Sequence, residues 1–152
     1  MSSSLSSVPG VAAIHGNTTF SFVKPDAFDK KDQIVADLNA CGITVLLGKE
    51  TTFTVELAKE FYKEHEGKPF YASLVTYITS GPVYVMVLHV KDAVAKVREV
   101  IGATDPKKAN PNTIRGKYGQ EMSRNAIHGS DSDASAEREI SLLFSKDELS
   151  KV

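Results

Sequence analysis

The order of elements along this sequence predicts an α+β fold: a ferredoxin-like sandwich with a four-stranded antiparallel sheet and helices packed on its faces. Three observations lead to this prediction. Segments of strand length alternate with amphipathic segments of helical length. Residues 83–90 form a nearly continuous apolar run, typical of a strand that is covered on both faces. Two strand–helix–strand units also follow each other in series, which is the arrangement of this fold.

The first part of the chain reads as one strand–helix–strand unit. Polar and apolar side chains alternate over residues 19–24, which predicts a strand that ends before Pro25. Apolar residues at helical spacing predict a helix over residues 32–40, and Gly42 is suited to cap its C-terminus. Residues 43–54 have the composition of a second strand.

Two helices are expected next. Thr54 is suited to cap a helix that begins at residue 55. One stripe of this helix consists of Ala58, Phe61, Tyr62 and His65. A shorter helix is predicted over residues 71–79, and the tripeptide Ser80-Gly81-Pro82 ends it.

The second half of the chain predicts two more strands, two helices and one long loop. In chain order these are a strand over residues 83–90, a helix over 92–101, a loop over 102–124, a strand over 125–128 and a helix over 132–144. The loop contains two prolines and no sustained periodicity. Loops of this length inside a compact domain are usually functional.

Composition bounds the class of protein. The chain has 152 residues, of which 41% are hydrophobic, and we expect a flexible tail over residues 1–16 followed by a single domain over 17–152. The net charge of −1 means that an anionic ligand must be held by locally placed cations. The single cysteine, Cys41, excludes an internal disulfide and, together with a tail that lacks Lys and Arg, favours a cytoplasmic location. No apolar run is long enough to span a membrane.

The first candidate for chemistry is His128. It lies where a predicted strand ends in a Gly-Ser-Asp turn before a helix, so that its ring would be fixed by the strand and open to a cleft. That position suits a nucleophile or a proton shuttle. A surface or core-filling histidine is the alternative. A metal site and a Ser-His-Asp triad are both disfavoured, because Ser130 and Asp131 are too close in sequence and no second metal ligand is near.

The second candidate is Glu139 on the last helix. The apolar stripe of that helix consists of Ala136, Ile140 and Leu143. Glu139 falls on the same stripe, and a buried carboxylate requires strong hydrogen-bond partners. Ser130 and His128 are the natural partners, and a carboxylate that orients an imidazole is a recurring support for catalysis. The alternative is a glutamate that reaches past the edge of the stripe to solvent.

Three cations are placed where they could clamp a polyphosphate. Lys24 ends the first strand, Arg98 lies beside the apolar stripe of its helix, and Arg115 lies in the long loop. Each could also be an ordinary surface charge. The P-loop motif GxxxxGK[ST] is absent, which disfavours a P-loop kinase.

Six motifs, in the same order, give the chain a specific resemblance. They are Lys24-Pro25-Asp26-Ala27, Lys68-Pro69-Phe70, Thr79-Ser80-Gly81-Pro82, Gly102-Ala103-Thr104-Asp105-Pro106, Thr113-Ile114-Arg115, and the segment NAIHGSDS over residues 125–132. In this set the chain resembles the nucleoside diphosphate kinases, and the resemblance covers residues 18 to 148.

The resemblance implies a role for each matching residue. His128 corresponds to a phosphorylated histidine, with Glu139 and Ser130 holding its ring. The residues that line the phosphates and the ribose correspond to Lys24, Tyr62, Arg98, Thr104, Arg115 and Asn125. Phe70 corresponds to the aromatic residue on which the base stacks, and Met122 to the apolar residue behind the other face of the base. Mg²⁺ is expected on the nucleotide phosphates, with no metal site built from protein side chains.

The implied reaction moves the γ-phosphate of a nucleoside triphosphate to a diphosphate by a ping-pong mechanism through His128. The long loop resembles that of the hexameric members, so a homohexamer is expected. Two other readings stay open: a nucleotide- or nucleic-acid-binding protein without turnover, and a scaffold that acts through its oligomer surface. A net charge of −1 predicts that any nucleic-acid binding is a weak, salt-sensitive side activity.

Overall fold

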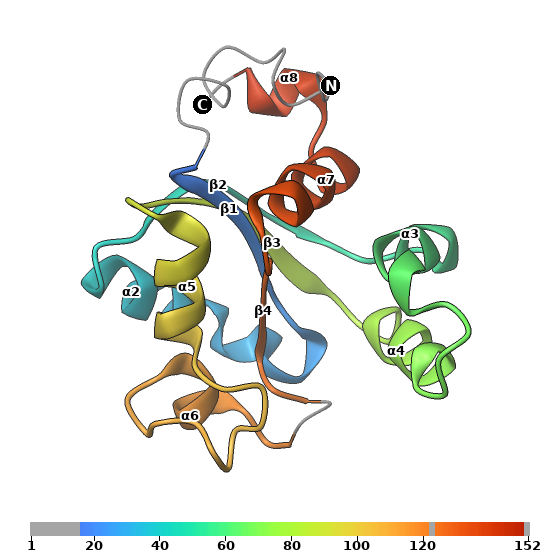
Figure 1. The fold of residues 1–152 in the computed structure, drawn as a ribbon, viewed down its shortest axis with the longest axis horizontal. Coiled ribbons are helices and arrows are strands. Elements are labelled where there is room, and N and C mark those ends of the chain that lie inside the picture. Colours follow the sequence, from blue (N-terminus) through green and yellow to red (C-terminus); the bar gives the residue numbers. More distant parts are fainter. Residues whose placement is uncertain (1–15, 122–123, 151–152) are drawn as a thin grey trace.

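A computed structural model describes residues 16–121 and 124–150, and its centre is a four-stranded antiparallel sheet in the order β2-β3-β1-β4 (Figure 1). The strands are β1 (Thr18–Val23), β2 (Thr44–Thr51), β3 (Val83–His89) and β4 (Ile127–Gly129). β1 pairs with β3 on one side and β4 on the other. The α+β class with an antiparallel sheet agrees with the prediction from the sequence.

Helices cover both faces of the sheet (Figure 1). The helices are α2 (Lys31–Ala40), α3 (Val55–Phe61), α4 (Tyr71–Ile78), α5 (Ala93–Ile101), α6 (Ile114–Tyr118), α7 (Asp133–Leu143) and α8 (Lys146–Leu149), with 3-10 turns η2 (Pro25–Lys30) and η3 (Lys63–His65). Because side chains alternate along a strand, β1 contributes Phe20 and Phe22 to the core under α3, α4 and α7, and Val23 to the core under α2 and α5.

The predicted long loop differs from the structure in one respect. Residues 114–118 form the short helix α6, whose N-terminus is capped by the Thr113 side chain accepting from the Gly116 N–H at 3.1 Å. Five residues are too few to show a helical period in the sequence, so the pattern gave no sign of it. The sequence also gave no prediction for η2 or for α8, which begins with a capping box between Ser145 and Glu148.

Two other boundaries were predicted wrongly. The helix that begins at Val55 ends at Phe61, and the chain continues through η3, so that His65 does not extend a continuous α-helix. β4 begins at Ile127 instead of residue 125. The predicted tail over residues 1–16 lies almost wholly outside the described residues. None of the helices in the described part of the chain has the length and apolar character needed to cross a membrane.

Candidate active site

Ala126 is the central residue of a tight turn directly before β4. Its φ is 77°, and the Ile127 N–H donates to the Asn125 carbonyl at 2.9 Å, which defines a γ-turn. A non-glycine residue at positive φ costs about 1–3 kcal/mol and persists only where its surroundings hold it. Here the Lys24 N–H donates to the Ala126 carbonyl at 2.8 Å, and the Asp26 carboxylate accepts from the Ala126 N–H at 3.2 Å. The turn takes the place of the first predicted strand residues.

The strand that follows holds His128 against an aromatic surface. His128 lies opposite Phe22 of β1 in the sheet. Its ring stacks on Phe22 (centroids 5.1 Å apart, planes at 21°) and meets Phe61 nearly edge-on (5.3 Å, 70°), with Phe20 at 6.0 Å. Its side chain is 20% exposed. Three aromatic neighbours therefore restrict the ring while part of it still faces solvent.

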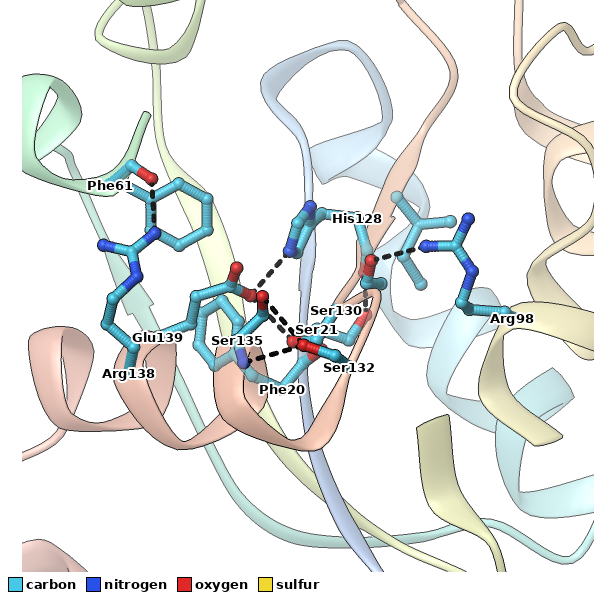
Figure 2. A network of polar contacts seen from close by, with 12 residues as sticks. Phe20, Ser21, Phe61, Arg98, His128, Ser130, Ser132, Ser135, Arg138 and Glu139 are labelled. Atoms are coloured by element: carbon cyan, nitrogen blue, oxygen red, sulfur yellow. Dashed lines mark hydrogen bonds and ion pairs between the residues drawn. The ribbon is translucent and has the colours of Figure 1, made fainter. Parts of the chain in front are cut away.

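A buried carboxylate binds one nitrogen of this ring. His128 Nε2 lies 2.8 Å from Glu139 Oε1, and the Ser130 hydroxyl donates to the same oxygen at 2.7 Å (Figure 2). The Ser130 hydroxyl oxygen also lies 3.2 Å from the Phe20 carbonyl, which places it between β1 and α7. Because a carboxylate only accepts hydrogen bonds, the neutral form of this ring carries its proton on Nε2 and its lone pair on Nδ1. In Figure 2 the second ring nitrogen points away from Glu139.

The helix α7 delivers Glu139 to this position. The Ser132 side chain caps its N-terminus, and its buried residues are Ala136, Glu139, Ile140 and Leu143. Glu139 is 5% exposed, so it lies on the inner stripe and not at its edge. The preceding residue, Arg138, donates to the carbonyls of Glu60 (3.1 Å) and Phe61 (2.9 Å) at the end of α3. Two neighbouring side chains of α7 thus have different partners: Glu139 binds His128, and Arg138 binds the C-terminal end of α3.

A cavity of about 370 Å³ opens in front of the His128 ring. The sequence-predicted residues in its wall are Tyr62, Arg98, Thr104, Arg115, His128 and Glu139. Arg98 and Arg115 also line an adjoining cavity of about 130 Å³ together with Thr104. Two guanidinium groups beside one imidazole give the cavity the donors that a phosphate chain requires.

Arg115 is set into the wall by its own hydrogen bonds. Its two terminal nitrogens donate to the carbonyls of Gly102 (3.0 Å) and Ile127 (2.9 Å). Its Nε is buried and has no partner among the described residues. Burial, and to a lesser extent the nearby Arg98 charge, lowers the pKa of Arg115 to about 10. The group stays cationic at neutral pH, and its buried Nε–H makes no hydrogen bond to a described residue.

Lys24 and Asn125 form a second line of polar groups behind the cavity wall. Lys24 Nζ donates to Asn125 Oδ1 at 2.7 Å, and Asn125 Nδ2 donates to the Thr104 carbonyl at 2.9 Å. Burial, followed by the Arg115 charge, lowers the pKa of Lys24 to about 8, although the Asp26 charge opposes this shift. The chain of contacts links the end of β1 to the Thr104 segment of the long loop.

The hairpin α3–η3–α4 forms the outer side of the site. Tyr62 lines the cavity, and burial together with the Glu139 charge raises its pKa, so its hydroxyl remains a donor. Phe70 does not line the cavity: it is 47% exposed and reaches the wall only through its ring contact with His65 at 5.4 Å. Met122 lies outside the described residues.

The structure adds residues that the sequence analysis did not assign to the site. His65 lines the cavity, and its Nδ1 is buried without a partner among the described residues. In the sequence, the only indication of this role for His65 was that a polar side chain lies on a helix stripe that otherwise packs inward. Asp131 also lines the cavity, and a hydrogen bond from Ser135, with the Arg98 charge nearby, holds the pKa of its carboxyl below the usual range.

The fold and the site together define a class: an α+β protein in which a sheet-borne imidazole, braced by a buried acid, faces a cationic cavity. Comparison with known proteins agrees with this class. The family profile described as Nucleoside diphosphate kinase matches residues 17–149. A nucleoside diphosphate kinase from Bdellovibrio bacteriovorus is 48% identical over 136 residues, which cover 88% of this chain and 96% of that protein.

Two solved structures are similar in both fold and sequence. The nucleoside diphosphate kinase of Aquifex aeolicus is 42% identical with a TM-score of 0.83, covering 87% of this chain and 97% of that one. The enzyme of Halobacterium salinarum, solved in complex with CDP, is 46% identical with a TM-score of 0.83, covering 88% and 91%. The chain belongs to the nucleoside diphosphate kinase family, and it is an enzyme that transfers phosphate between nucleoside tri- and diphosphates.

Proposed function

We propose that the transfer proceeds in two steps through a phosphohistidine at Nδ1 of His128. One observation carries this proposal: Nε2 is bound to Glu139 at 2.8 Å, while the ring lines the cavity that holds Arg98 and Arg115. The nitrogen with the free lone pair is therefore Nδ1. A neutral imidazole is nucleophilic near pH 7, and the phosphoramidate that it forms is reactive enough to pass the phosphate on.

In the first step the Nδ1 lone pair attacks the γ-phosphorus of a nucleoside triphosphate. The N–P bond forms while the bond from phosphorus to the β–γ bridging oxygen breaks, and the diphosphate leaves with that electron pair. Positive charge develops on the ring, and the Glu139 carboxylate stabilises it through the Nε2 proton. In the second step a β-phosphate oxygen of another diphosphate attacks the same phosphorus, and the lone pair returns to Nδ1.

The cationic groups position the phosphates and stabilise their charge. Arg98 and Arg115 present guanidinium donors in the cavity wall, and the Arg115 Nε–H makes no hydrogen bond to a described residue. The Tyr62 hydroxyl adds a neutral donor, and Lys24 a second-line charge. We assign Asn125, which is held between Lys24 and Thr104, to the ribose and phosphate contacts from the sequence resemblance. His65 adds to the same wall its Nδ1, which has no partner among the described residues.

Base recognition falls to Phe70 in this proposal. Its half-exposed ring lies at the outer side of the site, beyond His65. A ring that only stacks on the base accepts every nucleotide, because each base has a π-face and no edge is read. We assign Met122 to the other face of the base from the sequence alone.

We infer that Mg²⁺ enters the site on the nucleotide. The described residues contain no group of three or more His, Cys, Asp or Glu side chains that could hold a metal ion. The cavity wall does offer the carboxylate of Asp131 and the hydroxyl of Thr104, which suit a hard cation that keeps phosphate and water ligands. When bound, the ion would neutralise part of the phosphate charge during transfer.

A homohexamer and a cytoplasmic location complete the proposal. β2 pairs only with β3 among the described strands, and its side chains are exposed or half-buried, so its outer edge is available to a second copy. A light-scattering mass would give the subunit number. The single cysteine, Cys41, is exposed and unpaired, which suits a reducing compartment.

The decisive experiment traps the intermediate. The enzyme is incubated with ATP and quenched at alkaline pH, and the protein is digested for mass spectrometry. We expect acid-labile phosphate on His128 and its removal on addition of GDP. His128→Ala should lose both labelling and exchange, whereas the control His89→Gln, at the end of β3, should retain them. Full exchange activity in His128→Ala would refute the mechanism.

A further inference from the structure

Asp26 lies in the first motif of the sequence but has no part in the reaction described above. It follows Lys24 and Pro25 at the start of η2, and it does not line the cavity. Its carboxylate nevertheless makes two contacts that join distant parts of the chain. One oxygen accepts from the Tyr77 hydroxyl, and the other accepts from the Ala126 N–H at 3.2 Å.

The contact to Ala126 acts on the γ-turn that precedes β4. Both polar backbone groups of Ala126 are held by the segment that follows β1: its N–H by the Asp26 carboxylate, and its carbonyl by the Lys24 N–H at 2.8 Å. The turn has a positive φ that alanine does not adopt without support. Asn125 is the first residue of this turn, and His128 directly follows its last residue, Ile127.

Tyr77 fixes the carboxylate from the other side. Its hydroxyl donates to Asp26 and accepts from the Asp26 N–H at 3.0 Å, which closes a small ring of hydrogen bonds. Burial and the hydrogen bond to Asp26 raise the pKa of Tyr77, so the hydroxyl keeps its proton. Tyr77 belongs to the last turn of α4, the helix that begins directly after Phe70. The ring of hydrogen bonds therefore ties the nucleotide-side hairpin to the turn that presents the nucleophile.

We propose that Asp26 and Tyr77 are positioning residues for the phosphoryl transfer. The Asp26 carboxylate holds the Ala126 turn in its positive-φ conformation and so sets the places of Asn125 and His128, and Tyr77 holds Asp26 and anchors α4 to the same point. The inference rests on the proposed function of His128. It predicts a loss of transfer rate from residues that touch neither substrate nor the reacting atoms.

Three variants test the proposal. Asp26→Ala removes both acceptors, and we expect the single-turnover rate of His128 phosphorylation at saturating ATP to fall by about tenfold to 100-fold, the scale on which a misplaced reacting group reduces a rate. Asp26→Asn keeps an oxygen for the Ala126 N–H and should recover the rate to within about threefold of the parent. Tyr77→Phe removes only the hydroxyl, and we expect a loss of about threefold to tenfold.

The control is Tyr71→Phe, the same chemical change six residues earlier on α4, where the hydroxyl makes no hydrogen bond to a described residue. It should leave the rate unchanged. A second readout is the hydrogen exchange of the Ala126 amide, followed by NMR, which should become faster in Asp26→Ala and stay protected in Asp26→Asn. A merely destabilising substitution would lower the amplitude of phosphorylation, through a smaller folded fraction, but not its rate.

The outcomes separate this inference from the mechanism on which it rests. If the parent enzyme forms no phosphohistidine, the mechanism fails, yet Ala126 exchange still reports on the turn. If the parent is phosphorylated and Asp26→Ala reacts at the parent rate, the positioning role is refuted. Equal losses in Tyr71→Phe and Tyr77→Phe would also refute it, since the hydroxyl contact to Asp26 would then be irrelevant.

Discussion

The two sides of the active-site cavity are built in different ways. The inner side, formed by β4, α7 and the neighbouring strand β1, holds His128 with a carboxylate at 2.8 Å and with the rings of Phe20 and Phe22, whose centroids lie within 6.0 Å; the Phe61 ring at the end of α3 adds a third contact at 5.3 Å. The outer side, formed by α3, η3 and α4, carries Phe70, which is 47% exposed and has ring contacts only with His65 and Lys68 among the described residues. His128 is therefore enclosed by core residues, whereas Phe70 projects from the surface, although α3 and α4 themselves pack on the core through residues such as Phe61 and Ile78.

The outer side is attached at two points by polar side chains. Arg138 donates to two carbonyls at the end of α3, and Tyr77 binds Asp26 from the end of α4. The difference follows from the tasks of the two sides. In-line transfer requires reacting atoms that are held in place, whereas bases of different size are accepted more easily by a ring that few neighbours constrain. Substitutions that disturb the placement of His128, including loss of the Tyr77 contact to Asp26, should therefore lower kcat, and substitution of Phe70 should raise KM.

The largest effect is expected from Glu139→Gln. The substitution keeps the shape but puts a neutral amide beside the Nε2 proton and the Ser130 hydroxyl, so the ring loses its charge partner as it becomes positive. We expect kcat to fall by about 10²-fold while the affinity for nucleotides stays within about twofold. Steady-state kinetics and calorimetric titration with ADP measure the two quantities. The control is Glu99→Gln, whose side chain is 72% exposed on α5, and an unchanged kcat in Glu139→Gln would remove the orienting role.

The inner side was largely predictable from sequence, because its signals are local. Glu139 falls on the apolar stripe of its own helix, which left burial and a reach past the stripe edge to solvent as the two possibilities, and the structure buries it. The γ-turn could not be predicted, since alanine carries no mark of a positive φ, whereas a glycine would have done so. The role of Asp26 was equally hidden. Its partners are 51 and 100 residues away, and only the folded chain brings them together.

The outer side was predicted less well, for a different reason. Residues 55–65 carry one helical pattern, yet the α-helix ends at Phe61 and a 3-10 turn begins at Lys63, and His65 at the end of this turn lines the cavity. Hydrophobic periodicity does not register a change of helix type within one stripe. The hydrophobic pattern also did not predict that Phe70 is exposed, because an aromatic side chain is usually expected in the core.

An effect of intermediate size is expected in the pH dependence of kcat/KM, and it tests the role of Lys24 behind the cavity wall. Burial lowers the pKa of Lys24 to about 8, so the free enzyme loses this charge as the pH rises through that value and keeps it below. We expect kcat/KM to fall by about tenfold per pH unit above pH 8, measured from about pH 6.5 to about 9.5 at constant ionic strength. kcat should change less, because bound phosphates favour the charged amine. In Lys24→Arg the fall should move to higher pH, and a profile identical to that of the parent would assign the titration to another group.

The smallest effect is expected on the outer side, from Phe70→Ala. Loss of the stacking surface should raise KM for all nucleoside triphosphates by about fivefold to 50-fold with kcat within about threefold, because the ring is remote from the reacting phosphorus. Stability should be nearly unchanged, since the side chain is half-exposed. Val55→Ala is the matched control: it lies on the same hairpin at 46% exposure and does not line the cavity, so its kinetics should equal those of the parent. A fall in kcat as large as that of Glu139→Gln would show that Phe70 helps to position the transferring phosphate, and the division of labour between the two sides would then be wrong.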